Sequence, residues 1–99
     1  MEFADLNQEE VEKASNMMKA ISHPMRLAIL GYLGEGVQLS VTEIHTLLKI
    51  EQSTASHHLG ILKDKGILAS VRKGKNTLYF LKQKNLSQLV RCISECACD

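Results

Sequence analysis

The sequence is poor in aromatic side chains and has no long apolar run. Phe and Tyr make up 4% of the 99 residues and Trp is absent, so the core has to be aliphatic. No segment approaches the roughly 18 consecutive apolar residues of a membrane-spanning helix. The acidic start, Met1–Asp5, also lacks the basic-then-apolar layout of a signal peptide. We therefore expect a globular protein of the cytoplasm.

Internal repeats, linkers and low-complexity tracts are also missing. The length predicts that residues 1–99 form a single domain. A chain this short buries only a modest fraction of its surface, so we expect a second copy to cover part of the apolar remainder. No cleft-forming glycine motif or nucleophile pattern is present, which argues against an enzyme.

The whole chain has almost no excess of positive or negative charge, but its segments do. The formal net charge is +1. Residues 1–51 carry four Lys or Arg against eight Asp or Glu, whereas residues 52–91 carry eight against one, a net of +7. Such a segment can bind a polyanion, although most basic runs are simply solvated faces.

Apolar spacing and capping residues predict four helices in the first two thirds of the chain. Asn7 and Glu10 open the first, over roughly 7–20. Pro24 suits the first turn of a second helix, which is apolar nearly all round and therefore predicted to be buried. Ser40 and Glu43 form a capping box for the third. Its predicted inward residues are Val41, Ile44, Leu47 and Leu48.

The fourth predicted helix, about 52–65, follows the third after a turn of a few residues, as in a helix-turn-helix. Its predicted inward residues are Ala55, Leu59 and Leu62. Strand-like segments at 67–71 and 77–81 flank a cationic segment, which predicts a hairpin with a polycationic tip. A last helix carries an apolar stripe from Leu86 to Ile93. The order α-α-α-α-β-β-α is mainly helical with a small β-hairpin wing, a winged helix-turn-helix.

The basic segment covers the fourth helix and the hairpin, so two independent patterns indicate a DNA-binding protein. The start of the fourth helix can enter the major groove and present side chains to base edges. The candidate base contacts are Gln52, Ser53, Thr54, Ser56 and His57. The candidate phosphate or minor-groove contacts are Lys63, Arg72, Lys73 and Lys75. The simpler interpretation of Ser53 and Thr54 is that they only cap the helix.

Three other histidines have structural interpretations. His23 precedes a proline and can cap the second helix. His58 lies beside an inward leucine and is expected to be half-buried packing. His45, the one histidine of the third helix, is expected at the surface.

Two blocks resemble the ArsR/SmtB family of winged helix-turn-helix metalloregulatory repressors. Residues 21–30 (ISHPMRLAIL) are similar to its second helix, and residues 52–68 (QSTASHHLGILKDKGIL) to its recognition helix running into the wing. The resemblance implies a homodimer joined through the first and last helices. It also implies repression at an inverted-repeat operator, relieved by an inducer. Glu51 departs from the family, where a small capping residue is common; an acid there favours the helix dipole but repels phosphate.

Three cysteines, Cys92, Cys96 and Cys98, lie in the last eight residues. An odd number in a cytoplasmic protein is not a disulfide framework. Three clustered thiolates suit As(III) or Sb(III), whereas Zn(II) would need a fourth ligand, such as Asp99 or a residue of the second copy. A redox pair, Cys92 with Cys96 or Cys96 with Cys98, and simple apolar packing are the other interpretations.

The resemblance bears on the inducer as well. Family members with a site on the third helix carry a Cys-x-Cys-type motif there, where this chain has VTEIH at 41–45. Members with a zinc site across the last helices use His, Asp and Glu, and no histidine follows His58. Persulfide sensors pair a second-helix cysteine with one in the last helix, and here Gly31 stands mid-helix without a thiol. The cysteines of this chain, Cys92, Cys96 and Cys98, resemble those of relatives whose inducer cysteines lie near the C-terminus.

Three functions stay open from the sequence. The first is a homodimeric repressor released by a thiophilic ion or an oxidant at the cysteines, with no cofactor otherwise required. The second is a winged-helix regulator without a switch, whose cysteines are only structural. The third is a protein-interaction module whose basic face holds an acidic partner.

Overall fold

Five helices and three strands follow one another in the described part of the chain, residues 7–34, 36–83 and 85–97 of a computed structural model. The elements are α1 (Gln8–Ile21), α2 (Pro24–Tyr32), β1 (Leu39–Ser40), α3 (Val41–Leu48), α4 (Gln52–Asp64), β2 (Leu68–Lys73), β3 (Asn76–Leu81) and α5 (Asn85–Ala97). The predicted helices and hairpin are confirmed, and β1 is an addition. β1 could not be predicted from the sequence, because a strand of two residues is too short to show the alternation of apolar and polar residues.

Local capping explains where the first helices begin. The Oδ1 atom of Asn7 accepts a hydrogen bond from the backbone N–H of Glu10, at 2.7 Å. The Nδ1 atom of His23 accepts one from the N–H of Met25 at 3.1 Å, so the predicted cap of α2 is confirmed. These bonds satisfy donors that the first turn of a helix otherwise leaves open.

The helix-turn-helix is fixed by a capping box and a left-handed residue. The Ser40 hydroxyl accepts from the N–H of Glu43, and the Glu43 carboxylate accepts from the N–H of Ser40. Lys49, with φ of 56°, then ends α3, and α4 begins three residues later. His45 is half-buried, with Nδ1 3.2 Å from the carbonyl of Ile50, so its predicted surface position is wrong.

The hairpin is longer than predicted. β2 and β3 are antiparallel in a register that runs from Leu68 opposite Leu81 to Lys73 opposite Asn76. Gly74 takes a positive φ of 63° in the tight turn, a conformation that glycine adopts without strain. β3 also pairs with β1, which ties the hairpin to the start of α3.

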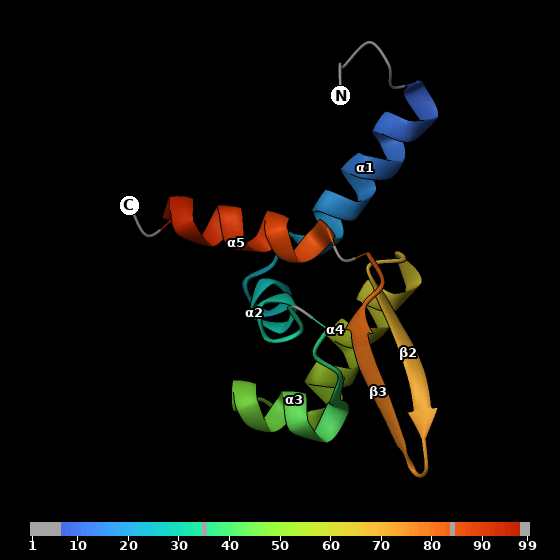
Figure 1. Ribbon diagram of the computed structural model, residues 1–99, viewed down its shortest axis with the longest axis vertical. Coiled ribbons are helices and arrows are strands. Elements are labelled where there is room, and N and C mark those ends of the chain that lie inside the picture. Colours follow the sequence, from blue (N-terminus) through green and yellow to red (C-terminus); the bar gives the residue numbers. More distant parts are fainter. Residues whose placement is uncertain (1–6, 35, 84, 98–99) are drawn as a thin grey trace.

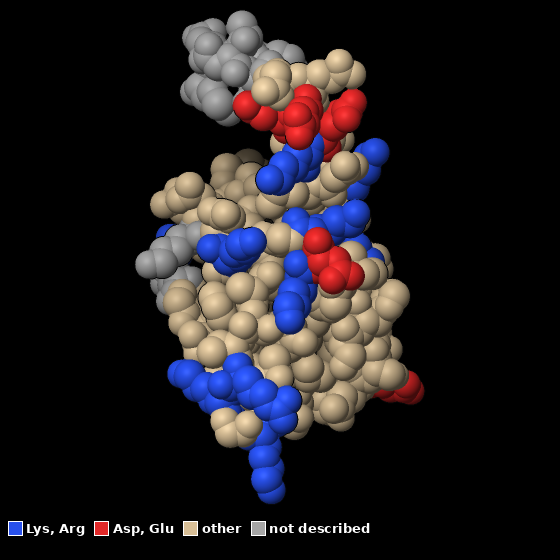
Figure 2. All heavy atoms as spheres, turned by 90° about the vertical axis from the view of Figure 1, so that its right-hand side faces the viewer, with Lys and Arg blue, Asp and Glu red and all other residues tan. Residues whose placement is uncertain are grey.

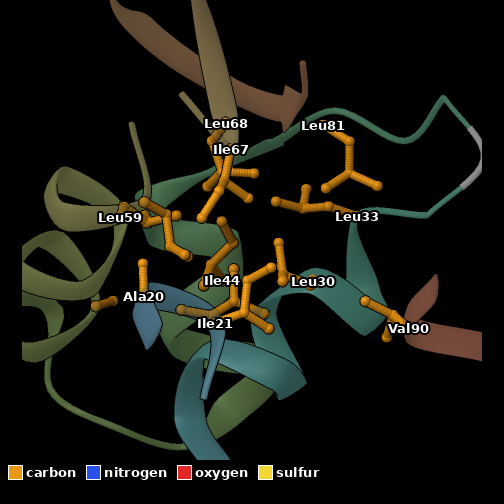
Figure 3. Close-up of a cluster of buried hydrophobic side chains, with 13 residues drawn as sticks. Ala20, Ile21, Leu30, Leu33, Ile44, Leu59, Ile67, Leu68, Leu81 and Val90 are labelled. Atoms are coloured by element: carbon orange, nitrogen blue, oxygen red, sulfur yellow. The ribbon is translucent and has the colours of Figure 1, made fainter. Parts of the chain in front are cut away.

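One apolar core joins the five helices to the base of the hairpin (Figure 3). The predicted inward residues of α4 are all buried. Leu47 is 45% exposed, so its predicted inward position is wrong: on α3 it lies about 100° round the helix from Leu48. The fully buried residues with the largest side chains are Ile29, Leu30, Leu33, Ile44, Leu59, Leu62, Ile67 and Leu68.

The two terminal helices extend from this core at the end opposite the hairpin turn (Figure 1). α5 packs on α2, and α2 packs in turn on α4. Only Ile29 and Leu30 of α2 are buried, so the prediction of a helix buried all round is wrong for the single chain. No helix among the described residues is both long enough and apolar enough to cross a membrane.

Candidate nucleic-acid interface

The start of α4 is free of the core on one side. Successive residues turn by about 100°, so the buried Ala55, His58, Leu59 and Leu62 share one side of the helix. The predicted base contacts, Gln52, Ser53, Thr54, Ser56 and His57, are all exposed. The helix therefore presents hydrogen-bonding side chains to a ligand along its first two turns.

Capping does not account for Ser53 and Thr54. The N-cap of α4 is Glu51, whose side chain makes no capping hydrogen bond. Ser53 and Thr54 lie inside the first turn, so the interpretation that they only cap the helix is wrong. The first N–H groups of α4 have no side-chain cap and point along the positive end of the helix dipole.

The hairpin brings three cations to its turn. Arg72 and Lys73 end β2 and Lys75 lies in the turn itself, and all three are exposed. The turn lies at the same end of the molecule as the start of α4 (Figure 1). In Figure 2 one group of Lys and Arg side chains covers that end, and other Lys and Arg side chains are spread over the middle of the molecule. Acidic side chains gather at the other end, over α1. The predicted hairpin contacts and the predicted base contacts thus lie toward the same end of the molecule.

Lys63 lies apart from this group. It is exposed in the last turn of α4, eleven residues beyond Gln52, which is about 16 Å along the helix. It therefore lies near the base of the hairpin and not beside its turn. Asp64 is next to it and exposed, so the cationic surface is interrupted there.

A contact that sequence reasoning missed holds α4 on its buried side. The Nε atom of Arg26 donates to Nδ1 of His58 at 3.2 Å, and the two residues are 32 positions apart. Burial lowers the pKa of His58, and the neighbouring charges of His23, Arg26 and His57 lower it further. His58 is 7% exposed, more buried than predicted. Nothing in the local sequence signals this pair.

The predicted thiol site is described in part. Cys92 and Cys96 are free and exposed on α5, one helical turn apart. Cys98 and Asp99 lie outside the described residues. Among the residues that are described, no three His, Cys, Asp or Glu side chains form a group that could hold a metal ion.

Known proteins share both the sequence and this geometry. Residues 21–71 match a family described as "Helix-turn-helix domain". The HTH-type transcriptional regulator YgaV of Escherichia coli K12 is 31% identical, over 98% of this chain and 97% of its own. The crystal structure of the transcriptional repressor BigR from Xylella fastidiosa is 34% identical, with a TM-score of 0.78 over 95% of this chain and 99% of that one.

A third similar structure is described as the homodimeric winged helix-turn-helix DNA-binding domain of a possible ArsR-family transcriptional regulator from Mycobacterium bovis. It is 26% identical, with a TM-score of 0.78 over 88% of this chain and 80% of that one. The chain belongs to the ArsR/SmtB family of winged helix-turn-helix transcriptional repressors. The predicted fold class and the main predicted function, DNA-binding repression of transcription, are confirmed.

Proposed function

We propose that two copies of this ArsR/SmtB-type repressor bind one inverted-repeat operator in double-stranded DNA. Each copy lays the start of α4 in the major groove and the hairpin along the adjacent phosphates. The observation that carries the proposal is the placement of exposed polar residues of α4 and exposed cations of the hairpin at one end of the molecule.

The two groups of residues have different chemistry. Gln52 can bond both edge positions of adenine, whereas Ser53, Thr54, Ser56 and His57 offer less selective donors and acceptors. Arg72, Lys73 and Lys75 contribute affinity and register through phosphate, and Lys63 contacts phosphate further along the groove. No enzymatic step is part of this function.

Exposed apolar side chains on the terminal helices support the dimer. Met18 of α1 is 47% exposed and Ile93 of α5 is 37% exposed in the single chain. Burial of such surface is what drives association. The homodimeric relative has the same fold. Residues 1–99 thus form one DNA-binding and dimerisation unit, which acts in the cytoplasm where its DNA lies.

Removing the hairpin cations tests the interface. In the variant R72A/K73A/K75A, the slope of log binding constant against log salt is expected to become shallower by about 2.7 for each protomer that loses three phosphate contacts. Affinity at low salt falls for operator and non-operator DNA alike, because phosphate contacts carry no sequence information. Fluorescence titration of labelled duplexes at several salt concentrations measures both quantities.

The matched control is K13A/K19A, which removes exposed cations from α1. Its slope is expected to equal that of the wild type. An unchanged slope in the hairpin variant would rule out the hairpin contact. Equal affinity for every duplex, whatever its sequence, would favour the interaction module for an acidic partner.

A second proposal concerns the inducer. Two exposed thiols one turn apart on α5 favour a thiophilic inducer, As(III) or Sb(III) with Cys98 as third ligand, Zn(II), or oxidation of a cysteine pair. α5 packs on α2 and α2 on α4, so a ligand on α5 can alter the placement of the recognition helix. The alternative is a repressor without such a switch, whose cysteines are structural.

Titration of each inducer into the protein–operator complex tests the thiol site. An effective ion or oxidant is expected to weaken operator binding by about 5–150-fold, the usual range of coupling between two sites. The variant C92S/C96S/C98S should bind operator normally and lose this response. A response that persists in the triple variant would exclude the cysteines, and the absence of any response in the wild type would favour the repressor without a switch.

A further inference from the structure

Three histidines and one arginine meet where α4 packs against the turn between α1 and α2. The rings of His23 and His58 have centroids 4.7 Å apart, and those of His57 and His58 are 5.6 Å apart. Arg26 contacts both sides of this junction. Its Nε donates to Nδ1 of His58 on α4, and its Nη1 donates to the carbonyl of Ala20 on α1, at 3.0 Å.

The hydrogen bonds define the charge state of the junction. An arginine side chain can only donate, so Nδ1 of His58 has to accept and its proton is on Nε2. Nδ1 of His23 also accepts, from the N–H of Met25. A protonated imidazole has no acceptor nitrogen, so protonation of His58 removes the bond from Arg26.

We propose that Arg26 is a positioning residue for the recognition helix, and that it holds α4 at the operator-binding angle only while His58 is neutral. The proposal rests on the proposed function. His58 and the exposed His57 are adjacent in α4, so a shift of the His58 side chain moves residues at the proposed base contacts.

The surroundings of His58 oppose its protonation. It is buried on its helix, and the charged or titratable groups that act on it are His23, the N-cap residue of α2, Arg26 of α2 and His57 of α4. Among the described residues that act on it, none is a carboxylate that would stabilise the cation. α1 contributes a carbonyl, from Ala20, which is occupied by Arg26. Because the pKa of His58 is lowered, its ring stays neutral in the intact junction at neutral pH, and protonation in acid breaks the bond from Arg26.

Two variants of His58 separate the charge from the side chain. His58→Asn places an amide oxygen near the position of Nδ1, so it accepts from Arg26 but cannot be protonated. His58→Leu fills the space without an acceptor. Affinity for operator and for a scrambled duplex is measured at pH 7.5 and pH 5.5, and their ratio reports positioning because non-specific phosphate binding cancels.

In the wild type the ratio is expected to fall between pH 7.5 and pH 5.5 by at most about tenfold. This is the limit when protonation is confined to the broken junction, where His58 has the ordinary histidine pKa of about 6.5. His58→Asn should keep the ratio at both pH values, and His58→Leu should have a low ratio at both. His45→Asn is the control, because His45 lies on α3, outside the junction and outside the proposed DNA contacts; this variant should keep the acid-dependent fall.

Thermal melts show which variants are folded at each pH. If His58→Leu does not fold, the comparison of wild type with His58→Asn decides alone. A ratio that falls equally in both would overturn the proposal while leaving the operator function intact. Absence of operator preference in the wild type at pH 7.5 would instead overturn the proposed function.

Discussion

Replacing Leu59 by alanine is expected to lower the free energy of unfolding by about 2–5 kcal/mol, the range for a fully buried leucine. Leu59 has no exposed surface and lies on the buried side of α4, among the other core side chains (Figure 3). Its truncation leaves a cavity that the surrounding helices can only partly close. Urea unfolding followed by circular dichroism measures the change.

The free energy lost in Leu59→Ala is large relative to the whole free energy of unfolding. Domains of this kind are stable by about 5–15 kcal/mol, so the variant unfolds at far lower urea or in its absence. Leu47→Ala is the matched control, because Leu47 is 45% exposed on the neighbouring helix. It should change the free energy by no more than about 0.5 kcal/mol, as surface substitutions do. Equal losses in the two variants would contradict the assignment of the core.

The parts of the fold that the sequence predicted well are those with local signals. The cap at Asn7 and the capping box at Ser40 use residues three positions apart, so their bonds form within one helical turn. The buried positions of α4 follow from a spacing of three and four residues. The hairpin turn is marked by a glycine that needs a positive φ.

The parts that the sequence did not predict depend on distant partners. β1 exists because β3, some forty residues further along the chain, offers a free edge to Leu39 and Ser40. The half-buried position of His45 depends on the path of the chain after α3. The pair of Arg26 and His58 forms because α2 and α4 pack together, and neither residue carries a local signal of that contact.

The candidate site was predictable in kind but not in extent. Net charge located the cationic segment, because charge requires no structural information. Net charge could not show that Lys63 and Lys75 lie near different ends of α4, since a run of cations in the sequence does not tell where each side chain lies in the fold. The hairpin carries Lys75 to the end where α4 begins, while Lys63 stays at the other end of that helix.

Replacing Ile93 by glutamate is expected to convert the dimer into monomers and to weaken operator binding by about 100-fold or more. Ile93 is exposed on α5, in the apolar stripe proposed to meet the second copy. In a two-fold interface one substitution places a charge in both halves of the contact, so its effect is doubled. Each monomer then binds one half-site without the gain from linkage to the second. Sedimentation equilibrium and operator titration measure the two effects.

Leu47→Glu is the control for oligomeric state, because Leu47 is at least as exposed as Ile93 but lies on α3. The Leu47→Glu variant is expected to keep the molecular mass of a dimer in sedimentation equilibrium. Circular dichroism should show both variants folded, since neither side chain is part of the buried core. If Ile93→Glu also keeps the dimer mass, α5 does not form the interface.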